Sequence, residues 1–258
     1  MPTIGMRELP AGIKVCYPVF RDRIPTRAAS WPGGISRDLP QEMSRRRGRL
    51  RLFREGAPRR GATGAEELVM RKIIYWVHAS IDGFIAGPNG EFDWPAVGPE
   101  LFAYSNGINE HVDTLMYGRV VWDFMAAYWP TADADPETTD EHARSFAPYW
   151  RRTPKVVVSR TLEKAAWDAR VIGANLAEEV AELKRGPGKD ILLTGGAEVA
   201  ASLTDLGLLD DYRIVIHPVV LGGGRRLFLE PKDRVGMTLV ESRTFDSQTV
   251  MLRYERRP

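Results

Sequence analysis

Residues 191–203, ILLTGGAEVAASL, join an apolar run to a helix-like pattern through two glycines. The run 191–193 is typical of a buried strand, and apolar residues recur at helical spacing after Gly196. Two interpretations of Gly195 and Gly196 are open. They form a tight strand-to-helix turn, or they leave the amides of a helix N-terminus uncovered, where an anion can bind. Both interpretations make the stretch a strand that passes directly into a helix.

The same alternation of short strands and helices continues on both sides of this stretch. Strands are predicted at 72–79, 113–118, 154–159, 190–195 and 211–220, helices at 99–112, 119–129, 174–186 and 196–207, and a terminal hairpin at 237–256. Asn175 and Gly186 are the expected caps of the third helix, and 130–142 is expected to be a polar loop. Such alternation forms βαβ units. We therefore predict an α/β fold with three αβα layers and a mostly parallel central sheet that ends in an antiparallel hairpin.

The first 70 residues differ in composition from the rest of the chain. They hold thirteen arginines and one lysine against seven acidic residues, whereas residues 71–258 hold 22 basic and 27 acidic residues. Because no strand or helix period is sustained there, 1–69 is predicted to be a disordered extension rich in Arg, Pro and Gly. A basic arm that binds nucleic acid is the alternative. Met70 precedes the first predicted strand, so we expect one domain at 70–258 and a natural start near Met70.

Composition excludes several kinds of site. Cys16 is the single cysteine, so neither an intrachain disulfide nor a cysteine-based zinc site can form. The four histidines are scattered without metal-ligand spacing, and no metal is expected. No apolar run reaches the roughly 18–20 residues of a membrane span, and no signal peptide is evident. A cytoplasmic protein is the default expectation.

Besides the strand before Gly195, two predicted strands end in residues that suit phosphate groups. Ligands of such sheets bind beyond the carboxyl ends of the strands. Gly118 ends a strand and Arg119 opens a helix, so free amides and a guanidinium meet there. Ser159 and Arg160 follow another strand, and a hydroxyl beside a guanidinium suits a phosphomonoester. For each pair the alternative is an ordinary turn with a solvated arginine.

Two loops are further candidates. The loop after the first strand carries Asp82 and Asp93, and the latter lies between Phe92 and Trp94. A carboxylate in apolar surroundings can have a raised pKa and bind a polar heterocycle, although Asp82 with the next glycine could be only a turn. The run 222–224 is three glycines followed by Arg225. It either lets the backbone approach a ligand closely or forms a flexible crossover. No nucleophile elbow is present, so a hydrolase is not expected.

Together and in order, these stretches resemble the dihydrofolate reductase-like family, and especially the reductase domain at the C-terminus of the bacterial bifunctional deaminase-reductase of riboflavin synthesis. The resemblance covers 71–258 and none of 1–70. Its motifs are ASIDGFIAGPNGEFDW (79–94), LMYGRVVWD (115–123), VVVSRTLE (156–163), ILLTGGAEVAASLTDLGLLDDYRI (191–214) and IHPVVLGGGRRLF (216–228).

The resemblance implies NADPH as cofactor and assigns residues to its parts. Gly118 and Arg119 match positions near the phosphates, and Ser159 and Arg160 match the loop that holds the adenosine 2′-phosphate. The pyrophosphate turn is matched by Thr194, Gly195, Gly196, Ala197 and Glu198. The loop 80–94 matches the mobile loop that closes over nicotinamide and substrate. Relatives of this branch commonly pair, so a homodimer is expected.

The resemblance also has two departures. Dihydrofolate reductases carry an acidic residue on the helix after this loop, and neither Asp93 nor Glu100 is a secure match for it. The zinc-binding deaminase half of the riboflavin enzyme is missing, which leaves only the reductase step.

The expected function is an NADPH-dependent reductase that transfers hydride to a small heterocyclic or ribosylamino-pyrimidine-like substrate. The cofactor supplies the hydride, and the protein supplies orientation and electrostatics. Asp82 is expected to position the substrate or the closing loop, and Asp93 to bind substrate or relay a proton. Gly223, Gly224 and Arg225 are candidates for substrate contact. Two alternatives remain: a nucleotide-binding sensor without turnover, and a nucleic-acid binder that uses the arginine-rich arm.

Overall fold

The computed structural model describes residues 70–134 and 141–257. Its centre is an eight-stranded sheet with the order β5-β4-β3-β6-β1-β7-β10-β9. From β5 to β7 every pair of neighbours is parallel, whereas β10 is antiparallel to both β7 and β9. The predicted α/β fold with its mostly parallel sheet and antiparallel C-terminal hairpin is therefore confirmed. The predictions for 1–69 lie outside the described residues.

The strands and helices alternate along the chain as follows. The strands are β1 (Ile73–Ser80), β2 (Phe84–Ala86), β3 (Val112–Gly118), β4 (Lys155–Val158), β5 (Arg170–Ile172), β6 (Asp190–Thr194), β7 (Asp211–His217), β8 (Arg225–Arg226), β9 (Met237–Thr244) and β10 (Val250–Arg256). The helices are α1 (Pro99–Glu110), α2 (Arg119–Tyr128), α3 (Glu141–Arg152), α4 (Leu176–Arg185) and α5 (Ala197–Asp205), with a 3-10 turn at Trp129–Thr131. Strands β2 and β8 pair with each other.

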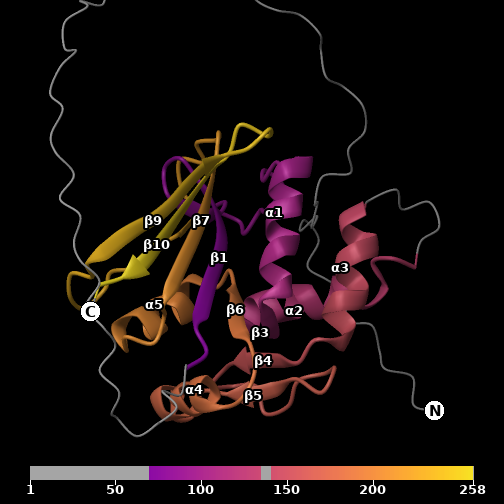
Figure 1. Cartoon of the computed structure of the whole chain (residues 1–258), viewed down its shortest axis with the longest axis vertical. Helices are drawn as coiled ribbons and strands as arrows, with labels where there is room; N and C mark the ends of the chain where they lie inside the picture. The colour runs from indigo at the N-terminus through magenta and orange to yellow at the C-terminus, as the bar shows by residue number, and fades with distance from the viewer. Residues whose placement is uncertain (1–69, 135–140, 258) are drawn as a thin grey trace, which may run out of the picture. The chain divides into compact units, whose positions relative to one another are not determined.

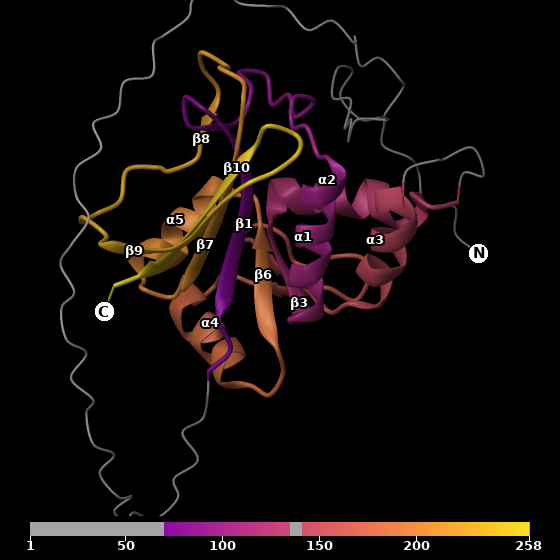
Figure 2. The same ribbon diagram turned by 45° about the horizontal axis from the view of Figure 1, so that its top comes forward.

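Helices cover both faces of the sheet (Figures 1 and 2). Ile74 and Trp76 of β1 belong to a core that also contains buried side chains of α1, α2 and α3. Ile73, Tyr75 and the other alternate residues of β1 belong to a second core with side chains of α4 and α5. Because successive side chains of a strand point to opposite faces, a strand between two helical layers must be apolar throughout. This explains the uninterrupted run IIYWV in β1.

Helix α3 contradicts part of the predicted polar loop at 130–142. The helix begins at Glu141 and buries Ala143, Ala147 and Trp150 against the core. Pro148 lies inside it and lacks a backbone donor, which hid the helical pattern in the sequence. The pairing of β2 with β8 likewise lies in stretches that were expected to be loops.

The start of α4 also differs from the expected capping. Asn175 stands at the N-cap, but its side chain makes no capping hydrogen bond. The Glu179 carboxylate instead accepts hydrogen bonds from the amides of Gly173 at 2.8 Å and Asn175 at 3.1 Å. The glutamate thus reaches back to amides that precede the helix, whereas the first amides of α4 itself receive no side-chain cap.

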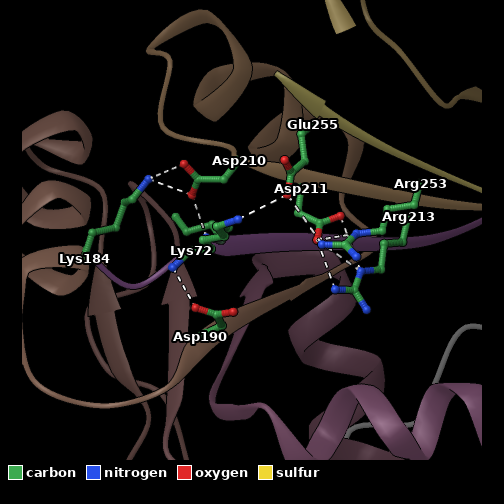
Figure 3. A network of polar contacts seen from close by, with 9 residues as sticks. Lys72, Lys184, Asp190, Asp210, Asp211, Arg213, Arg253 and Glu255 are labelled. Carbon is green, nitrogen blue, oxygen red and sulfur yellow. Dashed lines mark hydrogen bonds and ion pairs between the residues drawn. The ribbon is translucent and has the colours of Figure 1, made fainter. Parts of the chain in front are cut away.

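Ionic contacts tie the strands together at the edge of the sheet where the parallel strands begin (Figure 3). Asp211 is buried and accepts hydrogen bonds from Arg213 at 3.0 Å and Arg253 at 2.9 Å. Lys184 of α4 contacts Asp210 at 2.7 Å. These side chains join α4, the start of β7 and β10 at this edge of the sheet. In the part of the chain that the structure describes, no helix is long and apolar enough to span a bilayer.

Candidate functional site

The parallel strands end together at one edge of the sheet. Gly118, the last residue of β3, pairs with Val158, the last residue of β4. Thr194 at the end of β6 pairs with Trp76 of β1. Strand β1 then continues beside β7 as far as Ser80, which pairs with His217 at the end of β7. The order of strand ends along this edge is therefore β4, β3, β6, β1 and β7. Ligands of open α/β sheets bind at this edge.

A cavity of about 520 Å³ opens at the strand ends. Its wall is mostly apolar and aromatic, with Ile85, Phe92, Phe124 and Tyr128 among its side chains. Of the predicted site residues, the following line it: Thr194, Gly195, Gly196, Ala197, Glu198 and Arg225. A concave, largely apolar space with few polar groups is the usual form of a small-molecule site.

The glycine turn places two helix N-termini beside the cavity. Gly195 has φ +58° and Gly196 has φ +74°, a left-handed backbone that favours glycine. A Cβ atom on Gly196 would lie 3.7 Å from the amide nitrogen of Gly118, so the first turns of α2 and α5 approach each other there. Neither helix has a side-chain cap. The uncapped amides of both helices are therefore available to an anion.

The four remaining candidates for the phosphates lie on the same edge but outside the cavity wall. Arg119 opens α2 as predicted, and its exposed guanidinium lies 3.7 Å from Asp123. The Ser159 hydroxyl accepts hydrogen bonds from the amides of Thr161 at 3.2 Å and Leu162 at 3.0 Å. Arg160 is exposed. The pairing of Gly118 with Val158 brings these two strand ends together.

Asp82 joins two loops and is not part of the cavity wall. Its carboxylate accepts hydrogen bonds from the Ser80 hydroxyl at 2.6 Å and from the amides of Leu221 at 3.1 Å and Gly222 at 2.7 Å. Donation by Ser80, followed by the two amides, holds the pKa of the Asp82 carboxyl below its usual range. Of its two expected roles, the geometry therefore favours the one in loop position.

Asp93 is exposed and lies outside the cavity wall, although Phe92 lines it. The sequence pattern suggested that the neighbouring aromatic rings enclose this carboxylate, but in the structure they do not. Its expected role in substrate binding stays a prediction that this geometry does not favour.

Replacement of Asp82 by alanine is expected to speed hydrogen exchange at the amides of Leu221 and Gly222 about tenfold, since each loses its acceptor. Because the pKa of Asp82 is lowered in the folded protein, the carboxylate stabilises the loop above the ordinary pKa of an aspartate. That contribution is lost as the pH falls through the folded value. Amide exchange followed by NMR measures both effects. Asp93→Ala is the control, and an equal effect of this variant would contradict the assignment.

The three-glycine run 222–224 allows its backbone to lie close to the backbone at the end of β2. Gly224 has φ +121°, and a Cβ atom there would collide with the carbonyl oxygen of Ala86 in β2. Gly223 lies against Pro88. Arg225 then forms an ion pair with Glu198 of α5, and both side chains line the cavity. Thus Arg225 is placed to meet a ligand, whereas Gly223 and Gly224 fit the loop onto β2.

The sequence interpretation passed over two histidines that contact each other beside the cavity. His78 of β1 lines the cavity, and its Nδ1 atom lies 2.7 Å from Nε2 of His217 on β7. Burial lowers the pKa of His217 to about 4. Burial, and then the neighbouring His217 and His142, lower the pKa of His78 to about 3. The signal in the sequence that could have indicated these histidines is a polar residue near the end of an otherwise apolar strand.

The described residues include no group of three or more His, Cys, Asp or Glu side chains that could hold a metal ion. The site therefore consists of a glycine turn, two helix N-termini, an apolar cavity and a histidine pair.

These features define an α/β fold with a cavity at the carboxyl ends of its parallel strands. Residues 71–251 match the family model described as the RibD C-terminal domain. The chain belongs to this family of reductase-type domains.

Several relatives and structures are similar to the chain. It is 40% identical over 190 residues to the uncharacterized protein YyaP of Bacillus subtilis, covering 72% of this chain and 96% of the relative. YwjB of the same organism, also uncharacterized, is 27% identical over 188 residues, covering 72% and 98%. A putative riboflavin biosynthesis protein from Shewanella sp. PV-4 superposes with a TM-score of 0.55 at 22% identity, covering 73% of this chain and all of that one.

A larger bifunctional enzyme shares the fold over part of its length. This is the diaminohydroxyphosphoribosylaminopyrimidine deaminase/5-amino-6-(5-phosphoribosylamino)uracil reductase of Thermotoga maritima. The TM-score is 0.51 at 13% identity, and the match covers 73% of this chain and 57% of that one. At sequence identities this low, the two superpositions show a shared fold and nothing more.

Proposed function

We propose that the protein is an NADPH-dependent reductase that transfers hydride to a small heterocyclic substrate of the ribosylamino-pyrimidine type. The observation that carries the proposal is the glycine turn at Gly195 and Gly196, where two uncapped helix N-termini meet beside a cavity. Membership of a reductase family and the names of the two similar structures support the reaction class and the kind of substrate.

The order of the strand ends matches the order of the parts of a dinucleotide. Ser159 and Arg160 at β4 would hold the adenosine 2′-phosphate, and the amides at Gly118 and Gly196 would hold the pyrophosphate. The cavity beyond them, from β6 to β1, would take the nicotinamide ring and the substrate. A Cβ atom on Gly196 would point at the backbone of Gly118, so the turn fits a group that needs bare backbone.

When bound, NADPH supplies a hydride to an electrophilic carbon of the substrate. The chain supplies orientation and a dry environment. The aromatic and aliphatic wall excludes water, and the amides of α2 and α5 hold the negative charge of the phosphates. Asp82 holds the loop that carries the glycine run against the loop after β1. A homodimer is part of the proposal, and sedimentation of the full chain tests it.

Arg160→Ala is expected to weaken NADPH binding about tenfold and to leave NADH binding unchanged, because only NADPH carries the 2′-phosphate. The measurement is quenching of tryptophan fluorescence during titration of the full chain with each nucleotide. Arg185→Ala is the matched control, since this arginine is exposed in the last turn of α4 at the opposite edge of the sheet.

Three outcomes of these titrations, combined with an assay of NADPH oxidation, are informative. Failure of the wild-type chain to bind either nucleotide would overturn the proposal. Equal losses for the two nucleotides with Arg160→Ala would remove the assignment of the 2′-phosphate. Binding without oxidation of NADPH by any acceptor would indicate a nucleotide sensor.

A further inference from the structure

The histidine pair forms a directed chain of hydrogen bonds that ends at the cavity. The backbone amide of Ala96 donates to Nδ1 of His217 at 3.1 Å. Nε2 of His217 lies 2.7 Å from Nδ1 of His78. His217 is buried, whereas His78 is half-buried and borders the cavity.

The direction of the chain follows from its first donor. A backbone amide can only donate, so Nδ1 of His217 accepts and carries no hydrogen. A neutral imidazole carries one hydrogen, which therefore lies on Nε2 of His217 and is donated to Nδ1 of His78. Since Nδ1 of His78 is an acceptor, its own hydrogen lies on Nε2. Among the described residues, this Nε2–H has no hydrogen-bond partner in the protein.

The surroundings keep both rings neutral. The titratable groups around His78 are His217 on β7, His142 on α3, Tyr128 in the cavity wall, and the Glu198–Arg225 ion pair at the mouth. Among residues 70–134 and 141–257, no unpaired carboxylate lines the cavity near the ring. The rings of Trp76 and Phe92 pack edge-on against it. The lowered pKa values of both histidines agree with this environment.

We infer that His78 is the hydrogen-bond donor in this part of the cavity wall, and that it binds a neutral acceptor such as a carbonyl oxygen or an imine nitrogen. His217 is a positioning residue that sets the tautomer of His78. The inference rests on the proposed function for the kind of molecule bound. A neutral imidazole N–H can polarise a carbonyl without giving up its proton. A ligand that presents a cationic N–H at this point would face a donor and would be rejected.

The tautomers can be measured without a substrate or turnover. We would record long-range ¹H–¹⁵N spectra of the full chain labelled in its four histidines. Assignment would use His78→Gln, His111→Gln and His142→Gln variants. The expected result is an Nε2–H tautomer for both His78 and His217, with neither ring protonated above pH 5. An Nδ1–H tautomer of His78, or its protonation near the ordinary pKa of about 6.5, would overturn the inference.

Variants of His217 separate positioning from simple packing. His217→Gln can still accept from Ala96 and donate to His78, so the Nε2–H tautomer of His78 should persist. His217→Leu removes both bonds, so His78 should show mixed tautomers and protonate at a higher pH than in the wild type. Equal spectra of His78 in the two variants would contradict the role of His217.

Addition of NADPH distinguishes two sources of the acceptor. A downfield shift of the His78 Nε2–H with NADPH alone would assign the acceptor to the carboxamide of the cofactor. NADPH binding that leaves this resonance unchanged would assign it to the substrate. If NADPH does not bind at all, the proposed function fails, while the tautomer measurement still decides the inference about His78.

Discussion

Replacement of Gly196 by leucine is expected to weaken NADPH binding by about 100-fold, which corresponds to about 2.7 kcal/mol. Gly196 has φ +74°, a conformation that costs an L-residue about 1–2 kcal/mol. Its Cβ atom would also point toward the amide of Gly118, where the two helix N-termini approach each other. The side chain would therefore cover the amides that we assign to the pyrophosphate. Fluorescence titration of the variant with NADPH measures the loss.

Gly207→Leu is the matched control for this variant. Gly207 follows the other end of α5 and has φ +70°, so both substitutions strain the backbone in the same way. A Cβ atom on Gly207 would make an ordinary contact, 3.5 Å from the guanidinium of Arg256. NADPH affinity within twofold of wild type is expected for this control. Equal losses in the two variants would show that strain in α5, and not a covered anion site, weakens binding.

Asp211→Ala is expected to lower the free energy of unfolding by about 3 kcal/mol. The carboxylate is 1% exposed and lies between Arg213 and Arg253, whose side chains are 15% and 25% exposed (Figure 3). Its removal leaves two neighbouring guanidinium groups without their shared anion. Because both arginines keep some contact with water, the loss is expected at the lower end of the range for buried pairs. Urea denaturation followed by circular dichroism measures it.

Asp123→Ala provides the comparison for an exposed ion pair. Asp123 lies 3.7 Å from Arg119, and the two side chains are 58% and 57% exposed. Such pairs contribute less than about 1 kcal/mol, so the variant should unfold close to wild type. A similar loss in Asp123→Ala and Asp211→Ala would mean that burial of Asp211 does not matter for stability.

The sequence was sufficient for those parts of the fold that depend on local patterns. The apolar run of β1, the glycine turn before α5 and the terminal hairpin each have a short-range signature, and all three occur where they were expected. Helix α3 was missed as a whole because its buried face is two alanines and one tryptophan around a proline. The pairing of β2 with β8 was missed because it joins residues that are far apart in the chain.

For the candidate site too, features that lie within one short stretch were predictable, whereas contacts between distant stretches were not. The glycine turn before α5 could be identified because glycine, strand and helix adjoin in sequence, while its role in binding pyrophosphate stays a prediction. Asp82 was predicted to position the substrate or the closing loop. Its partners Leu221 and Gly222 are about 140 residues away, so these contacts could not be predicted from the local sequence. The His78–His217 contact likewise spans 139 residues. Neither histidine has a sequence neighbour that indicates the pairing.

The most direct test of the central claim is a crystal structure of the full chain with NADPH. We expect the pyrophosphate oxygens to accept hydrogen bonds of about 3 Å from the first amides of α5. We also expect the nicotinamide ring to lie in the cavity on the side of His78. A dinucleotide bound away from the turn at Gly195 and Gly196, or a cavity that stays empty at saturating NADPH, would contradict the account.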